Sequence, residues 1–196
     1  MTEPAHELSY TLAEYLALEA ASDTRHEYLN GEIFAMAGGT PEHGALAANV
    51  IRLLGTALLD RPCVVYTSDV RIRVLATGLN TYPDVSVTCG AIERDPQDAS
   101  TIVNPVVLVE VLSDSTEAYD RGEKFAHYRR IPSLRDYLLV SQHEARIEHY
   151  RRNDDGTWTL RDVASSETVR LSIGCELPVG AVYRDPFAPP QAAPAL

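Results

Sequence analysis

The sequence is short of lysine, cysteine and long apolar runs, and each shortage excludes a class of protein. Its 196 residues contain three cysteines, Cys63, Cys89 and Cys175, and no pair of them has a CxxC spacing. This pattern excludes a zinc ribbon and predicts reduced thiols in a cytoplasmic protein. No apolar run approaches the roughly 18 residues of a membrane helix, and the first ten residues lack the basic and apolar regions of a secretory signal.

Lysine occurs only once, as Lys124, although lysine and arginine together number 17. The other basic residues are therefore all arginine, so this chain uses arginine wherever a generic cation is sufficient. A lysine that remains suggests a need for a compact ammonium with three rotatable donors, which a planar guanidinium cannot replace. Lys124 is thus a candidate functional residue. The alternative is an ordinary surface pair with Asp120, four residues earlier on a helix.

Several sequence patterns of known chemistry are also missing. The chain has no GxSxG nucleophile elbow, no phosphate-binding P-loop and no GxGxxG fingerprint, so acyl transfer, nucleotide hydrolysis and dinucleotide chemistry have no support. A composition of 45% hydrophobic and 23% charged residues is typical of a soluble globular protein. We expect one domain over residues 1–184 and a disordered Pro/Ala-rich tail over 185–196.

The net charge of −11 argues against a nucleic-acid partner, but the charges are unevenly distributed. Residues 121–152 contain eight basic and four acidic residues, a local charge of +4 that leaves −15 for the remainder. One basic patch on an acidic body is compatible with binding a phosphate backbone. The alternative is a solvated charged face.

Local patterns predict the N-terminal elements. Thr11 and Glu14 form a capping box at the start of a short amphipathic helix. Residues 25–37 read as a hairpin turning at Asn30-Gly31. A helix then runs from Pro41 to about Leu59.

Residues 63–88 alternate with period two and predict two strands, 70–74 and 82–87, around a loop at 76–81. Pairing them about this loop places Arg73 near Asp84, so a cross-strand ion pair is the structural alternative for Asp84. Residues 90–104 are expected to form a connecting loop. Residues 106–112 are apolar on both alternating faces, as in a central strand.

Glu110 is the single charged residue of this central strand. A buried carboxylate must be paired, protonated or bound to a cation. The alternative is a carboxylate at the strand end that pairs with an arginine. Further along the chain, we predict a helix over 117–130, a strand over 136–140, a hairpin over 146–163 and a short strand over 168–173.

Asp84 and Glu110 lie on adjacent predicted strands, 26 residues apart (110 − 84). Two such carboxylates suit Mg²⁺ or Mn²⁺, which prefer oxygen ligands and keep several waters. With a nearby ammonium, this combination is typical of phosphodiester hydrolysis.

Here the sequence resembles the PD-(D/E)xK nuclease superfamily and, more closely, its restriction-endonuclease-like family of small bacterial proteins. The resemblance rests on Gly31-Glu32, on Pro83-Asp84, on the run Glu110 to Thr116 and on Asp120 to Lys124. It covers nearly the whole chain to about Tyr183. It implies an α/β fold with an α-β-β-β-α-β core, a mixed central sheet flanked by helices, an N-terminal helix and hairpin, and C-terminal hairpins.

The resemblance also implies roles for individual residues. Asp84 and Glu110 would be metal ligands together with a backbone carbonyl near Val111, and Lys124 would orient the attacking water. The sequence departs from the superfamily pattern at Leu112, where lysine is usual, so Lys124 must reach the site from the following helix. Secondary candidates for the rim of the site are Glu27, His43, Asp69 and Asp120.

The sequence supports two functions of different classes, an enzyme and a binding module. The first is a Mg²⁺-dependent (or Mn²⁺-dependent) DNA endonuclease, expected to be a homodimer because cutting both strands needs two sites, with RNA as an alternative substrate. The second is a catalytically silent nuclease fold that binds nucleic acid or protein. The net charge and the absent in-line lysine favour the second function, and the intact trio of Asp84, Glu110 and Lys124 favours the first.

Overall fold

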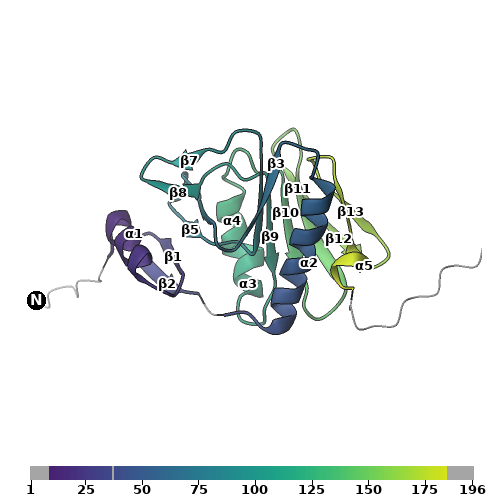
Figure 1. Cartoon of the computed structure of the whole chain (residues 1–196), viewed down its shortest axis with the longest axis horizontal. Helices are drawn as coiled ribbons and strands as arrows, with labels where there is room; N and C mark the ends of the chain where they lie inside the picture. Colours follow the sequence, from purple (N-terminus) through teal and green to yellow (C-terminus); the bar gives the residue numbers. More distant parts are fainter. Residues whose placement is uncertain (1–8, 37, 185–196) are drawn as a thin grey trace, which may run out of the picture.

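The computed structural model describes residues 9–36 and 38–184 and contains two six-stranded sheets and one two-stranded sheet (Figure 1). The tail expected at 185–196 and Ala37 at the end of the expected hairpin lie outside the described residues. No described helix is long and apolar enough to cross a bilayer. The assignment of residues 1–184 to one domain stays a prediction.

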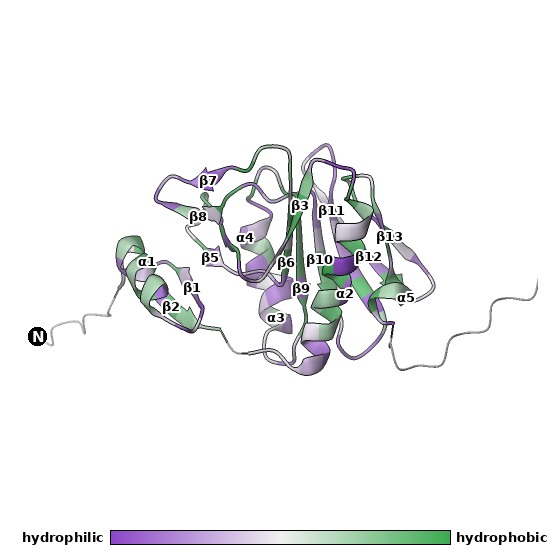
Figure 2. Cartoon of the chain, in the orientation of Figure 1, coloured by the Kyte–Doolittle hydropathy of each residue, from purple (hydrophilic) through white to green (hydrophobic). Residues whose placement is uncertain are grey.

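The main sheet is mixed, because its central strand pairs in parallel with one neighbour and antiparallel with the other. Its strands, in spatial order, are β12 (Trp158–Ala164), β11 (Arg146–Arg152), β10 (Asp136–Val140), β9 (Val107–Val111), β6 (Val85–Cys89) and β3 (Cys63–Thr67). The predicted central strand is β9, and all five of its residues are buried. Figure 2 shows the hydrophobic residues concentrated on these strands.

Helices cover both faces of the main sheet (Figure 1). On one face lie α2 (Pro41–Ala57) and α5 (Val179–Val182), and on the other lie α3 (Glu117–Tyr119), η1 (Asp120–Lys124) and α4 (Phe125–Tyr128). The chain order α2, β3, β6, β9, α3 to α4, β10 is the predicted α-β-β-β-α-β core. The predicted mixed α/β fold is confirmed.

The two faces of β9 belong to two separate cores. Val107 and Val109 pack in the core that contains Val50 and Leu54 of α2. Leu108 packs in the core that contains Tyr128 of α4. Successive side chains of a strand point to opposite faces, so an apolar run without alternation requires cover on both sides.

The second sheet carries the N-terminal elements. Its strands, in spatial order, are β2 (Glu32–Ala35), β1 (His26–Leu29), β5 (Asn80–Thr81), β4 (Arg71–Arg73), β8 (Asp98–Ile102) and β7 (Arg94–Asp95). The capping box at Thr11 is present at the start of α1 (Leu12–Ala21). Asn30 and Gly31 both have positive φ, as a type I′ turn requires. The third sheet pairs β13 (Thr168–Arg170) with β14 (Glu176–Pro178).

The strand assignment over 63–104 was partly wrong. The predicted strand 70–74 is β4 of the second sheet, and β3 takes the expected place beside β6. Pro83 has no backbone N–H to continue a ladder, so the predicted strand 82–87 is interrupted between β5 and β6. The expected loop at 90–104 contains β7 and β8.

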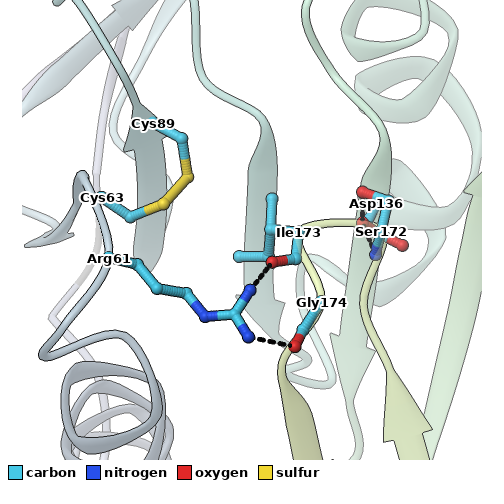
Figure 3. The surroundings of a disulfide bond; sticks show 7 residues. All are labelled: Arg61, Cys63, Cys89, Asp136, Ser172, Ile173 and Gly174. Atoms are coloured by element: carbon cyan, nitrogen blue, oxygen red, sulfur yellow. Dashed lines mark hydrogen bonds between the residues drawn. A yellow bond between two sulfur atoms is a disulfide. The ribbon is translucent and has the colours of Figure 1, made fainter.

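The cysteines also differ from the expectation. Cys63 and Cys89 face each other across β3 and β6 and form a disulfide, whereas Cys175 is free and buried (Figure 3). The prediction of reduced thiols was therefore wrong for this pair. Pairing depends on strand register, which the spacing of cysteines in the sequence does not reveal. Beside the disulfide, Arg61 donates to the carbonyl oxygens of Ile173 and Gly174 at 2.6 and 2.8 Å.

Candidate active site

Glu110 lies in the middle of the main sheet, on the face of β9 that is covered by the α3–η1–α4 helix. It is 4% exposed. One carboxylate oxygen, Oε1, is 3.0 Å from Lys124 Nζ and accepts a 2.7 Å hydrogen bond from the Tyr128 hydroxyl. The lone charged residue of the central strand is thus paired with a cation from the following helix.

Asp84 lies directly before β6, at the same end of the sheet as Glu110. The antiparallel register places Val85 opposite Val109, so Asp84, one residue earlier, falls opposite Glu110 and next to Val111. The Val111 N–H donates to Asp84 Oδ2 at 2.7 Å, and the Asp84 N–H donates to Glu110 Oε2 at 3.4 Å. Asp84, Glu110 and Val111 are therefore linked by hydrogen bonds from backbone N–H groups to the two predicted metal-binding carboxylates.

Lys124 is buried, 5% exposed, and is surrounded by acidic residues. Its ammonium is 3.0 Å from Glu110, 3.2 Å from Glu27 and 3.5 Å from Asp120. Burial lowers the pKa of Lys124, but attraction to these carboxylates outweighs burial and raises the pKa well above its usual range. Lys124 is therefore a permanent cation and hydrogen-bond donor, and not a base.

The helix that carries Lys124 is irregular where it passes the site. Within the predicted helix 117–130, residues Asp120–Lys124 form a π-helical segment between α3 and α4. The Tyr137 hydroxyl donates to the Asp120 carbonyl oxygen at 3.0 Å and so satisfies a carbonyl in this wider turn. Such π segments are frequent at functional sites.

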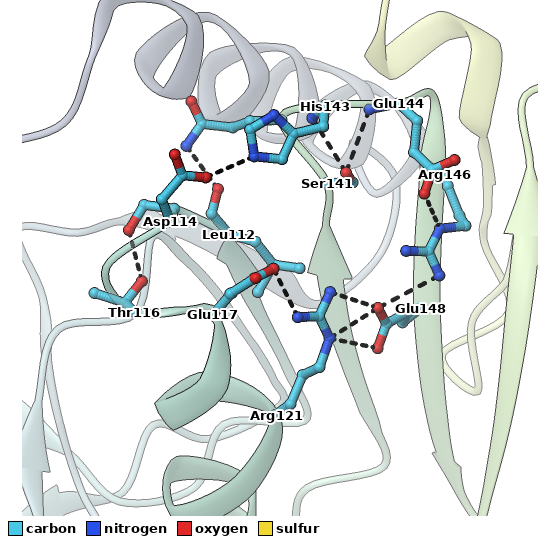
Figure 4. Close-up of polar contacts among 12 residues, drawn as sticks. Leu112, Asp114, Thr116, Glu117, Arg121, Ser141, His143, Glu144, Arg146 and Glu148 are labelled. Atoms are coloured by element: carbon cyan, nitrogen blue, oxygen red, sulfur yellow. Dashed lines mark hydrogen bonds and ion pairs between the residues drawn. The ribbon is translucent and has the colours of Figure 1, made fainter.

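The start of this helix is anchored by ion pairs on the rim of the site (Figure 4). The guanidinium of Arg121 donates to both carboxylate oxygens of Glu148 on β11, at 2.9 to 3.2 Å, and to Glu117 at 2.7 Å. His143 contacts Asp114 at 2.7 Å. These contacts fix η1 against the main sheet and thereby fix the position of Lys124.

His43 lies in the first turn of α2, where Thr40 caps the helix. Its Nε2 is 3.1 Å from Asp84 Oδ2. The hydrogen bond with Asp84 is the main cause of a raised pKa for His43; burial opposes the rise, and a backbone hydrogen bond with Val111 adds to it. A Cβ on Gly39 would lie 2.8 Å from the His43 ring, so glycine leaves the space that this ring occupies.

Negative charge exceeds positive charge in this cluster. Four carboxylates, from Glu27, Asp84, Glu110 and Asp120, face one ammonium and one imidazole. Burial raises the pKa of Glu110 to about 8, with opposition from Lys124 and support from Asp120 and Asp84. Burial likewise raises the pKa of Asp120. A buried excess of carboxylates is the environment that a cation relieves.

The donor set fits a hard divalent cation in charge and in ligand type, because Asp84, Glu110 and the Val111 carbonyl all offer oxygen. Among residues 9–36 and 38–184, however, no three His, Cys, Asp or Glu side chains are already grouped as metal ligands. Water or substrate oxygens would have to complete the coordination.

The secondary candidates divide into two groups. Glu27, His43 and Asp120 all contact Lys124 or Asp84. Asp69 does not join them: it is exposed and pairs with Arg25 and Thr67. The ion pair considered between Arg73 and Asp84 is also absent, because Arg73 binds Asp95 at 2.7 Å.

Three hydroxyl groups of the site were not predicted. Tyr128 binds Glu110, and both Thr81 and Tyr119 donate to Glu27. Tyr128 lies four residues after Lys124, so helical spacing could have identified it. No sequence pattern identifies Thr81 or Tyr119, because their partner Glu27 lies in a hairpin far from both of them in the chain.

Comparison with known proteins decides the family. A family model described as "Uma2: Putative restriction endonuclease" matches residues 12–180. The chain belongs to the Uma2 family. The resemblance seen in the sequence is confirmed, and with it the assignment to a family of nuclease type.

Two proteins of Synechocystis sp. (strain ATCC 27184 / PCC 6803 / Kazusa) are similar to this Uma2-family chain. Uncharacterized protein slr1290 is 42% identical over 172 residues, which cover 87% of this chain and 90% of that protein. Uncharacterized protein sll1609 is 35% identical over 153 residues, covering 78% and 86% respectively.

A solved structure shares the fold of the Uma2-family chain. It is the crystal structure of a "putative nuclease belonging to DUF820" from Anabaena variabilis ATCC 29413, with a TM-score of 0.73 and 18% identity. The match covers 88% of this chain and 97% of that chain. At this identity the likeness establishes the fold alone.

Proposed function

We propose that this protein is a divalent-metal-dependent endonuclease that hydrolyses phosphodiester bonds in DNA. The observation that carries the proposal is the buried cluster in which Asp84 and Glu110 lie in contact beside the only lysine of the chain. Membership of a family described as restriction endonucleases supports the same reaction class.

Asp84, Glu110 and the Val111 carbonyl would hold Mg²⁺ or Mn²⁺. When bound, the cation would acidify water and offset the charge that develops on the phosphate. Lys124 keeps its proton, so it orients the attacking water and donates to the developing oxyanion. Glu27 and Asp120 position the Lys124 ammonium, and Tyr128 positions the Glu110 carboxylate.

His43 has a separate part in the proposal. Its side chain is 19% exposed and that of Asp84 is 18% exposed, whereas those of Lys124 and Glu110 are 6% and 5% exposed. A scissile phosphate therefore reaches the cluster past His43 and Asp84. The raised pKa of His43 favours an imidazolium, whose positive charge would attract the phosphate.

The test is nicking and linearisation of supercoiled plasmid with Mg²⁺ or Mn²⁺, comparing the wild type with Lys124→Ala and Asp84→Asn. Cleavage by the wild type alone supports the proposal. Cleavage that survives both substitutions overturns the assignment of the site. Parallel assays on single-stranded RNA distinguish RNA from DNA as substrate.

A second candidate is a nuclease fold that binds nucleic acid or protein without cutting. The net charge of −11 and the lack of a preassembled metal-binding trio among the described residues favour it. Thermal stability separates the two functions. A metal site at Asp84 and Glu110 requires a rise in melting temperature with Mn²⁺, which a silent module does not show.

The homodimer and the cytoplasmic location stay proposals. Cutting both strands of a duplex calls for two sites, and light scattering of the purified protein tests the dimer. The location was inferred from reduced cysteines, and the Cys63–Cys89 disulfide removes that support.

A further inference from the structure

Of the sixteen arginines (17 − 1 lysine), six form ion pairs with described residues and ten do not, and four of these ten lie at one edge of the main sheet. Arg25, Arg71, Arg73, Arg121, Arg146 and Arg170 all form ion pairs. Arg129, Arg130, Arg135 and Arg152, here called the arginine patch, form none with any described residue. In a chain of net charge −11, an unpaired group of four guanidinium ions needs a physical explanation.

The patch is gathered by Arg152, the last residue of β11. Its backbone N–H donates to the Arg135 carbonyl oxygen at 2.8 Å. Its guanidinium donates to the carbonyl oxygens of Pro132, at 3.0 Å, and Arg129, and lies 4.8 Å from the centre of the Trp158 ring. Arg152 is therefore half-buried and fixed, while Arg129, Arg130 and Arg135 around it are exposed.

Three segments that meet at this edge contain no acidic residue, and the turn 153–156 that follows Arg152 contains Asp154 and Asp155. Arg130, Ile131 and Pro132 line a recess with residues 75–76 and Val103, so segments 75–78, 103–105 and 129–135 lie together. Their sequences, LATG, VNP and RRIPSLR, carry only positive charge. Burial lowers the pKa of Arg152, and repulsion from the neighbouring Arg135 lowers it further.

Asp136 follows Arg135 in the chain, but its carboxylate is buried and binds His149 and Ser172. Glu93 and Asp154 form no ion pair with any described residue, and the Glu93 carbonyl oxygen accepts a backbone hydrogen bond from Val103. The carboxylate of Asp155 accepts two hydrogen bonds from Thr157.

We propose that the arginine patch binds the phosphodiester backbone of a nucleic acid. Arginine is suited to this because its planar fork donates to two phosphate oxygens at once. The acidic remainder of the surface repels a nucleic acid, so a single positively charged patch also sets the orientation of the nucleic acid on the protein. The inference extends the proposed function by adding a substrate contact outside the active site, and it also stands if the protein binds without cutting.

The patch and the active site lie at opposite ends of the main sheet. Arg135 precedes β10 at the end where Asp136 pairs with Val107, whereas Glu110 and Asp84 lie at the end where Val140 pairs with Val111. Four residue steps of strand separate these ends by about 13 Å. Successive phosphates of one strand of a duplex rise by about 3.4 Å along the helix axis, so a duplex lying along the sheet would meet the patch on the order of four nucleotides or more from the scissile phosphate.

The test is binding of a short fluorescein-labelled DNA duplex by anisotropy, in EDTA so that no cleavage occurs. The variant is the triple substitution Arg129→Gln, Arg130→Gln and Arg135→Gln, which spares the structural Arg152. The matched control is Arg52→Gln, Arg161→Gln and Arg184→Gln, three exposed arginines that form no ion pair within the described part of the chain. Both triples remove three positive charges, from −11 to −14.

We expect the patch variant to bind the duplex at least about tenfold more weakly than the control at low salt, and the slope of log affinity against log salt to fall by about three. Unchanged binding by the patch variant overturns the inference, as does equal weakening in both triples or a wild type that binds no nucleic acid. Tight binding of an acidic peptide without DNA binding also overturns it.

Cleavage assays keep the two proposals apart. A wild type that binds through the patch but never cuts refutes the nuclease and leaves the patch intact. A wild type that cuts plasmid, with a patch variant that binds and cuts equally well, refutes the patch and leaves the nuclease intact.

Discussion

Among the described residues, one arginine and one lysine are buried, Arg71 in the second sheet and Lys124 beside the main sheet, and their surroundings differ. Arg71 is 8% exposed and pairs with one carboxylate, from Asp98. Its other donors reach hydroxyl groups: Thr101 at 2.8 Å, Tyr82 at 3.1 Å and Tyr15 at 3.4 Å. Lys124 is 5% exposed and faces three carboxylates within 3.5 Å.

The difference separates a structural cluster from a functional one. The Arg71 guanidinium is neutralised by a single carboxylate, and neutral hydroxyl groups accept its remaining hydrogen bonds. This arrangement keeps the free-energy cost of burying the ion low. Around Lys124 the carboxylates outnumber the cations, an arrangement that lowers stability and is retained where it serves chemistry. Substitutions in the two clusters should therefore act in opposite ways on stability and on activity.

The largest effect is expected from the carboxylates of the active site. Glu110→Gln and Asp84→Asn should each lower the plasmid cleavage rate on the order of a thousandfold, because each removes a charged ligand of the proposed cation. Glu110→Gln should also melt at or above the wild-type temperature, because burial raises the pKa of Glu110, which destabilises the folded protein at neutral pH, and the amide does not ionise. A variant that cleaves at nearly the wild-type rate, or a Glu110→Gln variant that is clearly less stable, would contradict the assignment of this cluster to function.

Arg71 should show the reverse behaviour. Arg71→Met leaves Asp98 without its partner and should lower the free energy of unfolding by about 3–5 kcal/mol, measured by urea denaturation. The folded fraction should cut DNA at the wild-type rate. The control is Arg170→Met, which breaks an exposed pair with Glu176 and should cost less than about 1 kcal/mol. Equal decreases in the free energy of unfolding of both variants would mean that Arg71 stabilises the fold no more than an exposed arginine does.

Metal binding sharpens the contrast further. Mn²⁺ at about 100 times its dissociation constant should stabilise the wild type by about 2.7 kcal/mol, seen as a higher melting temperature. The shift should vanish in Glu110→Gln and persist in Asp98→Asn, since Asp98 belongs to the other cluster. A shift that persists in Glu110→Gln would place the metal elsewhere.

The smallest effect is expected at His43, which contacts a carboxylate of the cluster without facing Lys124. His43→Ala should lower the cleavage rate by about tenfold, the loss of one hydrogen bond of roughly 1.4 kcal/mol. His43→Gln places an amide nitrogen near the position of Nε2 and should recover part of the rate. Identical rates for all three proteins would remove His43 from the site.

The sequence determined those features whose cause is local. The capping box at Thr11, the turn at Asn30-Gly31 and the helix starting at Pro41 each depend on a few neighbouring residues. The apolar run around Glu110 required a strand covered on both faces, and burial then required a partner for the charge. Lys124 could be selected because it is the only lysine, and Asp84 because it lies on the adjacent predicted strand and matches the family resemblance.

Only the tertiary structure decided which distant segments meet. Register joined Cys63 to Cys89, moved residues 71–73 into the second sheet and excluded Asp69 from the site. It also brought Glu27, from a hairpin nearly a hundred residues earlier, to Lys124. Strand pairing is set by contacts between residues far apart in the chain, and a single sequence holds no local pattern that specifies such partners.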